Sequence, residues 1–185
     1  LKLSETTDLL TGADYRHNAT DQIYEYLPYG FPGVPLSDDS AHTNQWSAYA
    51  SLHYQHEKKF GIETGGRFNH HSIYGFNYTA SINPYAFLTK DIKVYATLSS
   101  GYRIPSLYQL YSEYGNKLLK PENTTSVESG MQLSKTKYSL RVTGFLRSGS
   151  NIIFFYTDPI TYAGEYRNGD KQQDYGVETE VRFSP

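Results

Sequence analysis

The sequence predicts an all-β protein, an antiparallel up-and-down transmembrane β-barrel segment of about eight strands. Three observations lead to this prediction: apolar and polar residues alternate with a period of two, short and long connections alternate, and tyrosine is frequent. The 185 residues include 19 tyrosines but one tryptophan and no cysteine, and 38% of them are hydrophobic. This composition favours broad surfaces at the boundary between apolar and aqueous surroundings, because a tyrosine ring is apolar while its hydroxyl binds water or polar head groups.

Eight runs of the chain alternate between apolar and polar residues. In one of them Trp46, Ala48 and Ala50 alternate with Ser47 and Tyr49. Successive side chains of a strand point to opposite faces, so each run predicts a strand with one apolar and one polar face. A short turn of helix is expected at residues 107–111. The predicted strands cover residues 9–26, 44–56, 60–71, 77–89, 92–103, 124–134, 137–157 and 171–183.

The connections between these runs fall into two classes. Tight polar turns are expected at 57–59, 90–91 and 135–136, and a modest link near 71–76. Long connections rich in Pro, Gly, Asn and Tyr occupy residues 27–43, 104–123 and 158–170. Because the two classes alternate, an up-and-down sheet would carry its short turns at one end and its longer connections at the other. Outer-membrane barrels have this asymmetry, with short periplasmic turns and long extracellular loops.

Charged residues fall on the face opposite the aliphatic ones, where a large barrel would have a polar lumen. They are Glu63, Arg67, Arg103, Glu128, Arg141, Glu178, Glu180 and Arg182. The apolar face mixes large and small residues, a pattern that lipid tolerates better than a packed core does. Aromatic residues gather near predicted strand ends, which is typical of the girdles at membrane interfaces. They are Tyr24, Tyr26, Trp46, Tyr74, Phe76, Tyr78, Tyr102, Phe154, Phe155 and Tyr156.

Other classes of function find little support in the sequence. A net charge of −2 and a pI near 6.3 argue against a nucleic-acid partner. Neither a nucleophile elbow nor a phosphate-binding glycine loop is present, so no enzyme and no cofactor are predicted. His53 and His70 are expected to face each other across a hairpin, but a zinc site needs a third ligand. Asp38 and Asp39 lack the spaced acidic repeat of a calcium loop, so no metal site is predicted.

The segment from residue 101 to residue 130 carries a series of motifs: GYRIPSLYQLYS, then YGN, LKPE and S-x-E-x-G. This series resembles the signature of TonB-dependent outer-membrane receptors, and Thr11–Arg16 resembles a strand opening of the same family. The matching positions are Tyr102, Arg103, Pro105, Ser106, Leu107, Leu110, Tyr111, Gly115, Asn116, Leu119, Pro121, Glu122, Glu128 and Gly130. The resemblance implies a barrel of about 22 strands with an N-terminal plug, importing a scarce nutrient with energy relayed by TonB.

The motif also has a physical reading of its own, which favours an architectural role over ligand contact. Pro105 cannot donate a ladder hydrogen bond, so strand pairing is expected to stop there. Ser106 is placed to cap a helical turn. Arg103 and Glu128 are expected on neighbouring strands, where they would form a salt bridge facing the lumen.

On this reading, residues 1–185 form an internal to C-terminal barrel segment, with the plug and the remaining strands outside it. The resemblance implies the outer membrane as location, and as partners the TonB complex through the plug, membrane lipid and a small nutrient such as an iron-siderophore or cobalamin. Candidate ligand contacts in the long loops are Tyr26, Tyr29, Phe31, Tyr162, Tyr166 and Arg167. Two alternatives remain open: a complete small eight-stranded barrel serving as adhesin or lipid-modifying enzyme, and a soluble carbohydrate-binding β-sandwich.

Overall fold

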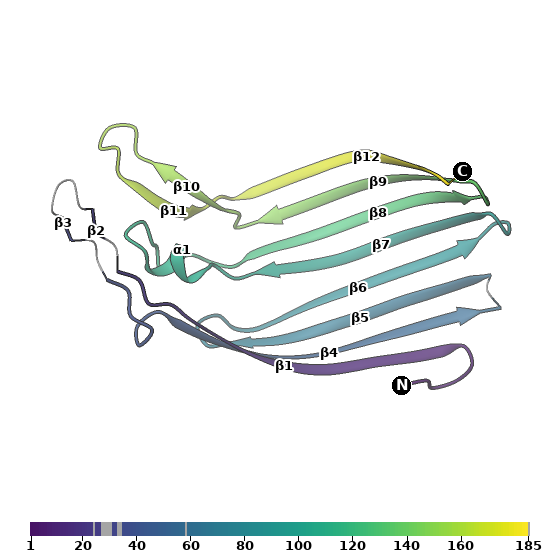
Figure 1. The fold of residues 1–185 in the computed structure, drawn as a ribbon, viewed down its shortest axis with the longest axis horizontal. Helices are drawn as coiled ribbons and strands as arrows, with labels where there is room; N and C mark the ends of the chain where they lie inside the picture. The colour runs from purple at the N-terminus through teal and green to yellow at the C-terminus, as the bar shows by residue number, and fades with distance from the viewer. Residues whose placement is uncertain (24, 27–30, 33–34, 58, 185) are drawn as a thin grey trace.

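The computed structural model describes residues 1–23, 25–26, 31–32, 35–57 and 59–184, with only the backbone of 25–26 and 31–32. Eight antiparallel strands form one sheet in the order β1-β4-β5-β6-β7-β8-β9-β12 (Figure 1). The predicted up-and-down sheet is therefore confirmed. The strands are β1 Thr7–Ala19, β4 His42–His56, β5 Phe60–His71, β6 Gly75–Phe87, β7 Ile92–Arg103, β8 Glu122–Ser134, β9 Tyr138–Ser150 and β12 Lys171–Phe183.

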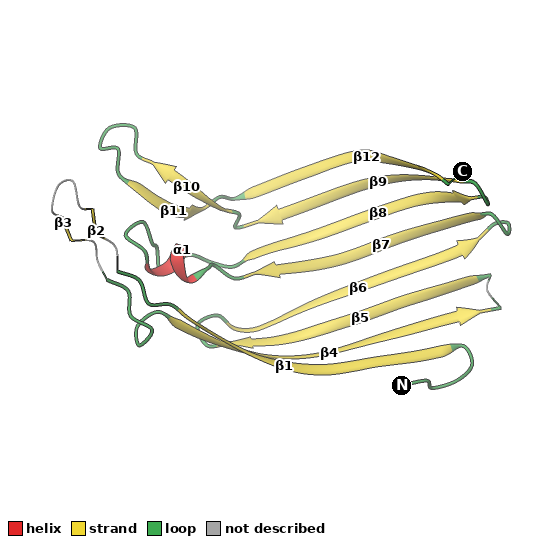
Figure 2. Ribbon diagram, in the orientation of Figure 1, coloured by secondary structure: helices red, strands yellow, loops and turns green. Residues whose placement is uncertain are grey.

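The remaining elements all lie at one end of this sheet, the loop end (Figure 2). They are the hairpin of β2 (Glu25–Tyr26) and β3 (Phe31–Pro32), the helix α1 (Leu107–Tyr111), and the hairpin of β10 (Ile153–Thr157) and β11 (Gly164–Asn168). Three tight connections lie at the opposite, turn end, where both chain termini are also found. The predicted separation of long and short connections is confirmed.

Two predicted strands are shorter in the structure than the sequence predicts, each for its own reason. The run 9–26 ends at Ala19, because Ala19 is paired with His42, the first residue of β4. The run 137–157 breaks after Ser150, since Asn151 adopts a left-handed backbone with φ of 56°. Beyond this break the chain leaves the sheet as β10, which is paired with β11 instead of β12.

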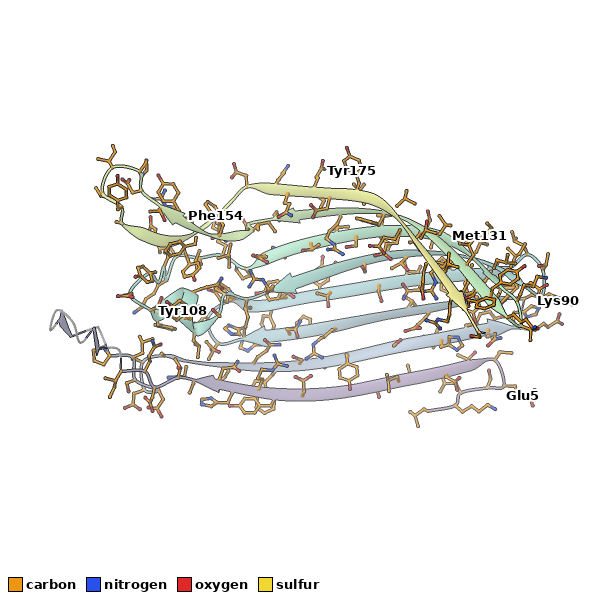
Figure 3. The ribbon with its side chains drawn as sticks, turned by 45° about the horizontal axis from the view of Figure 1, so that its top comes forward. Glu5, Lys90, Tyr108, Met131, Phe154 and Tyr175 are labelled. Carbon is orange, nitrogen blue, oxygen red and sulfur yellow. The ribbon has the colours of Figure 1, made fainter. Side chains whose placement is uncertain are left out.

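The register gives the sheet two chemically different faces. Ala50 lies opposite Thr11 and Gly66, and Gly66 lies opposite Ala80, so these small residues share the outer face. Large apolar side chains of this face are exposed, among them Trp46 (62%) and Val177 (72%). Tyr175 projects from the same face of β12 in Figure 3. The alternate residues form an inner face that carries the polar and charged side chains.

Aromatic residues form two rows on the outer face. The row near the loop end contains Tyr15, Trp46, Phe68, His70, Phe76 and Tyr78, with Tyr15 and Trp46 ring centroids 4.4 Å apart. The row near the turn end contains Tyr54, Phe60, Tyr138 and Phe183. From Trp46 to Tyr54 the strand covers about 26 Å, comparable with the ~25 Å apolar band of outer-membrane barrels. Phe154, Phe155 and Tyr156 were expected in such a girdle but lie outside the sheet in β10.

Neither alternative architecture is found. The eight strands form a single sheet, so the described residues contain no second layer of a sandwich. The sheet begins with β1 and ends with β12, and these two strands are not paired with each other, so no small closed barrel forms. Among the residues that the structure describes, the buried hydrophobic ones are Ala41, Leu110, Leu119 and Ile153, all at the loop end outside the eight strands.

Among the described residues, no helix is long and apolar enough to cross a membrane.

Candidate ligand-binding rim and inner face

The helix α1 begins as the sequence predicts. β7 ends at Arg103, before Pro105. The Ser106 hydroxyl accepts a hydrogen bond from the Gln109 N–H at 3.2 Å, and Gln109 Oε1 accepts one from the Ser106 N–H at 3.0 Å. This reciprocal capping box satisfies two backbone donors that a helix start leaves unpaired. The N-cap role of Ser106 is confirmed, and it fixes the direction in which the loop leaves β7.

A small hydrophobic core lies under this loop. Leu110, Leu119 and Ile153 are buried together, and Tyr111 and Tyr166 pack against them. Gly115 is required beside this core, because a Cβ there would stand 2.7 Å from the carbonyl carbon of Leu110. Four motif residues, Leu110, Tyr111, Gly115 and Leu119, thus lie in or beside this core.

Side-chain amides join this loop to the β10–β11 hairpin. Asn116 donates through Nδ2 to the Tyr166 carbonyl at 3.0 Å. Asn168 accepts from the Lys120 N–H at 2.8 Å and donates to the carbonyls of Lys120 and Asn151 at 2.9 and 2.7 Å. Residues 104–121 and 151–170, called the loop unit below, are therefore held together as one body.

An ion pair connects the loop unit to the sheet, but its partners differ from those expected. Arg103 binds both carboxylate oxygens of Glu122, one of them through Nε at 2.6 Å, and Glu122 also accepts from the Ile153 N–H at 2.7 Å. The expected pair of Arg103 with Glu128 is wrong. The register places Arg103 opposite Glu122, whereas Glu128 lies opposite Thr97, farther toward the turn end.

The connection between β5 and β6 also binds the loop unit, through a tyrosine hydroxyl. Tyr74, in the connection between those strands, donates its hydroxyl proton to the Leu119 carbonyl at 3.1 Å. Burial raises the pKa of Tyr74 to about 12, and the nearby Tyr102 and Tyr111 contribute to the rise. The hydroxyl therefore keeps its proton and remains a donor at any physiological pH.

The candidate ligand contacts are distributed unevenly. Tyr166 belongs to the core of the loop unit, whereas Tyr162 is 80% exposed with φ of 57°. Arg167 lies over the Tyr156 ring at 3.8 Å and forms a 2.5 Å ion pair with Glu165. In the other loop, the backbone of Tyr26 is paired with that of Phe31. The side chains of these two residues, and the whole of Tyr29, lie outside the described part of the chain.

An aspartate fixes the tip that carries Tyr162. Asp158 Oδ1 accepts from the N–H groups of Thr161 and Ile160 at 2.8 and 2.9 Å. These two donors hold the pKa of Asp158 below its ordinary value. The Tyr162 N–H donates to the Asp158 carbonyl, which completes the turn. Tyr162 is thus presented on a preorganised tip.

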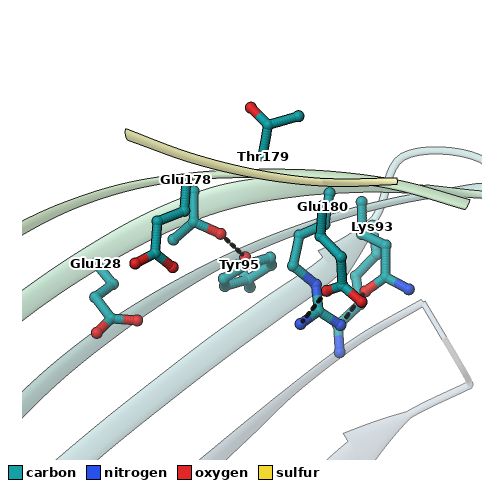
Figure 4. A pocket seen from close by; sticks show the side chains of 9 residues that line it. Lys93, Tyr95, Glu128, Glu178, Thr179 and Glu180 are labelled. Atoms are coloured by element: carbon teal, nitrogen blue, oxygen red, sulfur yellow. Dashed lines mark hydrogen bonds and ion pairs between the residues drawn. The ribbon is translucent and has the colours of Figure 1, made fainter. Parts of the chain in front are cut away.

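The inner face contains a hollow of about 640 Å³ that sequence reasoning did not delimit (Figure 4). Arg141 contacts Glu180 at 3.6 Å and Gln132 at 3.1 Å. Within the described residues, Glu128 and Glu178 have no hydrogen bond or ion pair. Alternation had placed these charges on one face, but their convergence depends on register. The lining residues are Lys93, Tyr95, Glu128, Gln132, Arg141, Thr143, Glu178, Thr179 and Glu180.

A second polar network on the inner face includes residues that the sequence analysis missed. Arg67 contacts Asp14 at 2.5 Å, donates to Asn69 at 2.9 Å and lies 5.6 Å from the Tyr49 ring centroid. The expected pairing of His53 with His70 is wrong, since His53 lies opposite Glu63 and His70 opposite Trp46. No group of three potential metal-ligating side chains occurs in the part of the chain that the structure describes.

Comparisons with known proteins agree with this architecture. The ferric enterobactin receptor of Pseudomonas aeruginosa is 28% identical over 130 residues, 58% of this chain and 17% of that receptor. The ferrienterobactin receptor of Escherichia coli is 28% identical over 142 residues, 65% of this chain and 19% of that receptor. This chain therefore spans less than a fifth of each receptor in these matches.

Structural comparison extends the likeness to nearly the whole chain. A crystal structure of a mutant of the ferric enterobactin receptor from Pseudomonas aeruginosa, in complex with enterobactin, superposes with a TM-score of 0.79 at 23% identity. The superposition covers 97% of this chain and 31% of the receptor chain, so this chain has the fold of part of that receptor. A family model described as TonB dependent receptor-like, beta-barrel, matches residues 1–184. The chain therefore belongs to the TonB-dependent receptor-like β-barrel family.

Proposed function

We propose that this chain forms part of the barrel wall and the outer loops of a receptor in the outer membrane that imports a ferric siderophore. The observation that carries the proposal is the two-faced sheet, whose outer face is apolar between two aromatic rows while its inner face is charged. Residues 1–185 act as one barrel segment, and a plug domain and further strands complete the receptor. This function requires no catalytic residue, cofactor or nucleic acid.

The nutrient is inferred from the relatives and from the rim. Two related receptors take their names from ferric enterobactin, which favours an iron complex over cobalamin. The exposed Tyr162 and the guanidinium of Arg167 suit an anionic complex with ring-bearing groups, through stacking and charge. Ligand contact by these two residues is the specific part of the proposal.

The inner face supports a second partner, the plug of the same receptor. Glu128 and Glu178 converge on the hollow without a partner among the described residues. Carboxylates that leave water require an opposite charge or hydrogen-bond donors. We infer that basic or donor groups of the plug fill this hollow, and that the TonB complex acts on the wall only through the plug.

Uptake by cells that lack their own copy of this gene, and that express the full-length receptor from an introduced copy, tests the proposal. These cells are supplied with a ferric siderophore labelled with radioactive iron, and in parallel with cobalamin. We expect iron uptake that stops when TonB is deleted. Replacing both Tyr162 and Arg167 by alanine should weaken siderophore binding about tenfold, whereas Leu118→Ala, an exposed change in the same loop unit, should not. Uptake of cobalamin alone, or a receptor absent from the outer membrane, would contradict the proposal.

A further inference from the structure

The junction of β6 and β7 differs from every other junction of the sheet. β5 and β6 are paired without interruption from Phe60–Ala86 to His71–Gly75. β6 and β7 are paired only from Ser81–Ser99 to Phe87–Lys93, and the pairs at Asn83 and Pro84 are missing. The two strands diverge toward the loop end in Figure 1. Both are interior strands, so the gap is independent of the unpaired edges at β1 and β12.

The sequence explains this weak junction. The Ala80 N–H donates to the Ser100 hydroxyl of β7 at 2.9 Å, so even-numbered residues of β6 direct their N–H groups toward β7. The Phe87 N–H accordingly points the other way, to the Lys59 carbonyl at 2.7 Å. Pro84 belongs to the even-numbered set and has no N–H to donate. The β6–β7 ladder therefore lacks a backbone donor at Pro84. At Ala80, the Ser100 hydroxyl takes the place of a backbone carbonyl as acceptor.

A hollow of about 340 Å³ lies on the outer face of the sheet where the β6–β7 ladder ends, at the Ser81–Ser99 pair. Its wall is made of small and aliphatic side chains that include Thr64, Ala80, Ile82, Leu98, Ser100 and Thr125. The hydroxyls of Thr64 and Ser100 are turned into the sheet, where Thr64 donates to the Ser81 carbonyl at 3.0 Å and Ser100 bonds Ala80. The surface offered to a ligand is therefore mainly methyl and methylene groups.

The register fixes the depth of this hollow. Ala80 lies opposite Gly66, which lies opposite Ala50 on β4. Ala50 stands midway between Trp46 of one aromatic row and Tyr54 of the other. In a receptor that spans the outer membrane, the hollow thus faces the middle of the bilayer. Water does not reach this level, and an empty apolar hollow forfeits dispersion contacts.

We propose that this hollow binds one acyl chain of a membrane lipid, which enters from the leaflet at the loop end, where β6 and β7 diverge. The site rests on the proposed location in the outer membrane. The acyl chain supplies the contacts that the end of the β6–β7 ladder leaves open and covers the wall beside Ser81 and Ser99, which also line the hollow. Its flexibility fits a hollow whose walls diverge.

Photo-crosslinking in vesicles tests the site. The full-length receptor is inserted into phosphatidylethanolamine vesicles that contain a small fraction of lipid with a diazirine near the end of one acyl chain. After illumination, mass spectrometry locates the labelled residues. We expect label at residues 80–82 and 98–100 at least fivefold above the label around Ala50. Equal labelling along the outer face overturns the proposal, and this reading uses the unmodified protein.

A matched pair of variants sharpens the result. Ala80→Leu fills the hollow and should abolish the excess label, whereas Ala50→Leu adds the same bulk on the same row of the outer face and should preserve it. Equal effects of the two variants also overturn the proposal. Siderophore binding, measured on the same samples, separates the two ideas. Label at the hollow without siderophore binding refutes the proposed ligand but keeps the lipid site, and the reverse result refutes the lipid site alone.

Discussion

The sheet and the loop unit are stabilised in opposite ways. In the sheet, large apolar residues such as Trp46 and Val177 are exposed, and long ladders hold the strands together. In the loop unit, Leu110 and Leu119 are 3% and 2% exposed, and side-chain amides bind backbone groups. The sheet therefore leaves its apolar face exposed and has, among the described residues, no core of its own, whereas the loop unit carries its own core, as a soluble domain does.

The largest expected effect is in the loop unit, at its buried leucine. Leu119→Ala should destabilise this unit by about 2–5 kcal/mol, because it removes buried methyl groups and leaves a cavity. Hydrogen exchange should accelerate in residues 107–121 and 153–168 while the strands stay protected. Leu118→Ala, at a position that is 86% exposed, is the control. Equal acceleration in the strands would show that sheet and loop unit are one cooperative body.

A charge on the outer face tests the sheet side of the comparison. Ala50→Arg should lower the stability of the receptor in vesicles by about 2–4 kcal/mol, because it places a cation in the middle of the apolar band. Thr97→Arg adds the same group on the inner face opposite Glu128 and should cost much less. Unfolding by urea measures both, and equal losses would refute the assignment of the two faces.

Asn168 tests how the two loops are joined. Asn168→Ala leaves two carbonyls and one N–H without their side-chain partner and should weaken the docking of the hairpin by about 1–3 kcal/mol. Asn168→Asp keeps the acceptor for the Lys120 N–H, but it turns a carboxylate oxygen toward the carbonyls of Lys120 and Asn151 and should weaken the docking at least as much as Asn168→Ala. Protease cleavage within residues 151–170 reports the undocking, and an unchanged cleavage rate in Asn168→Ala would contradict this role.

The smallest expected effect is pH-dependent and lies at the turn end. Asp91 and Lys135 form an ion pair between neighbouring turns, which lowers the pKa of Asp91 from its ordinary value of 3.8. Since the folded pKa is lowered, the pair stabilises fully above pH 3.8 and its contribution is lost as pH falls through the folded value. Asp91→Asn should lower the unfolding temperature slightly at pH 7, and not in strong acid. Lys137→Gln, a lysine of the same turn, is the control; a difference that persists in acid contradicts this assignment.

Much of the molecule follows from local sequence. The alternation around Trp46 and Ala50 predicts the strands and their faces, because the period of two is a property of the extended chain itself. Pro105 and Ser106 predict the end of β7 and the start of α1, because a missing N–H and a capping hydroxyl act within a few residues. The order of short and long connections predicts which end of the sheet carries the loops.

Other features depend on which residues meet across strands, and here local sequence failed. Arg103 was expected to pair with Glu128 and His53 with His70, but the ladders place Glu122 and Glu63 there. The run 137–157 reads as one strand, although its last part leaves the sheet to pair with β11.

The sequence by itself determined the class of fold, the two faces of the sheet and the motif that assigns the family. The tertiary structure alone decided the register, the docking of the loop unit, and the convergence of Glu128 and Glu178. The physical reason is range: alternation and capping act between neighbours in the chain, whereas register is set by the sum of many contacts between distant strands.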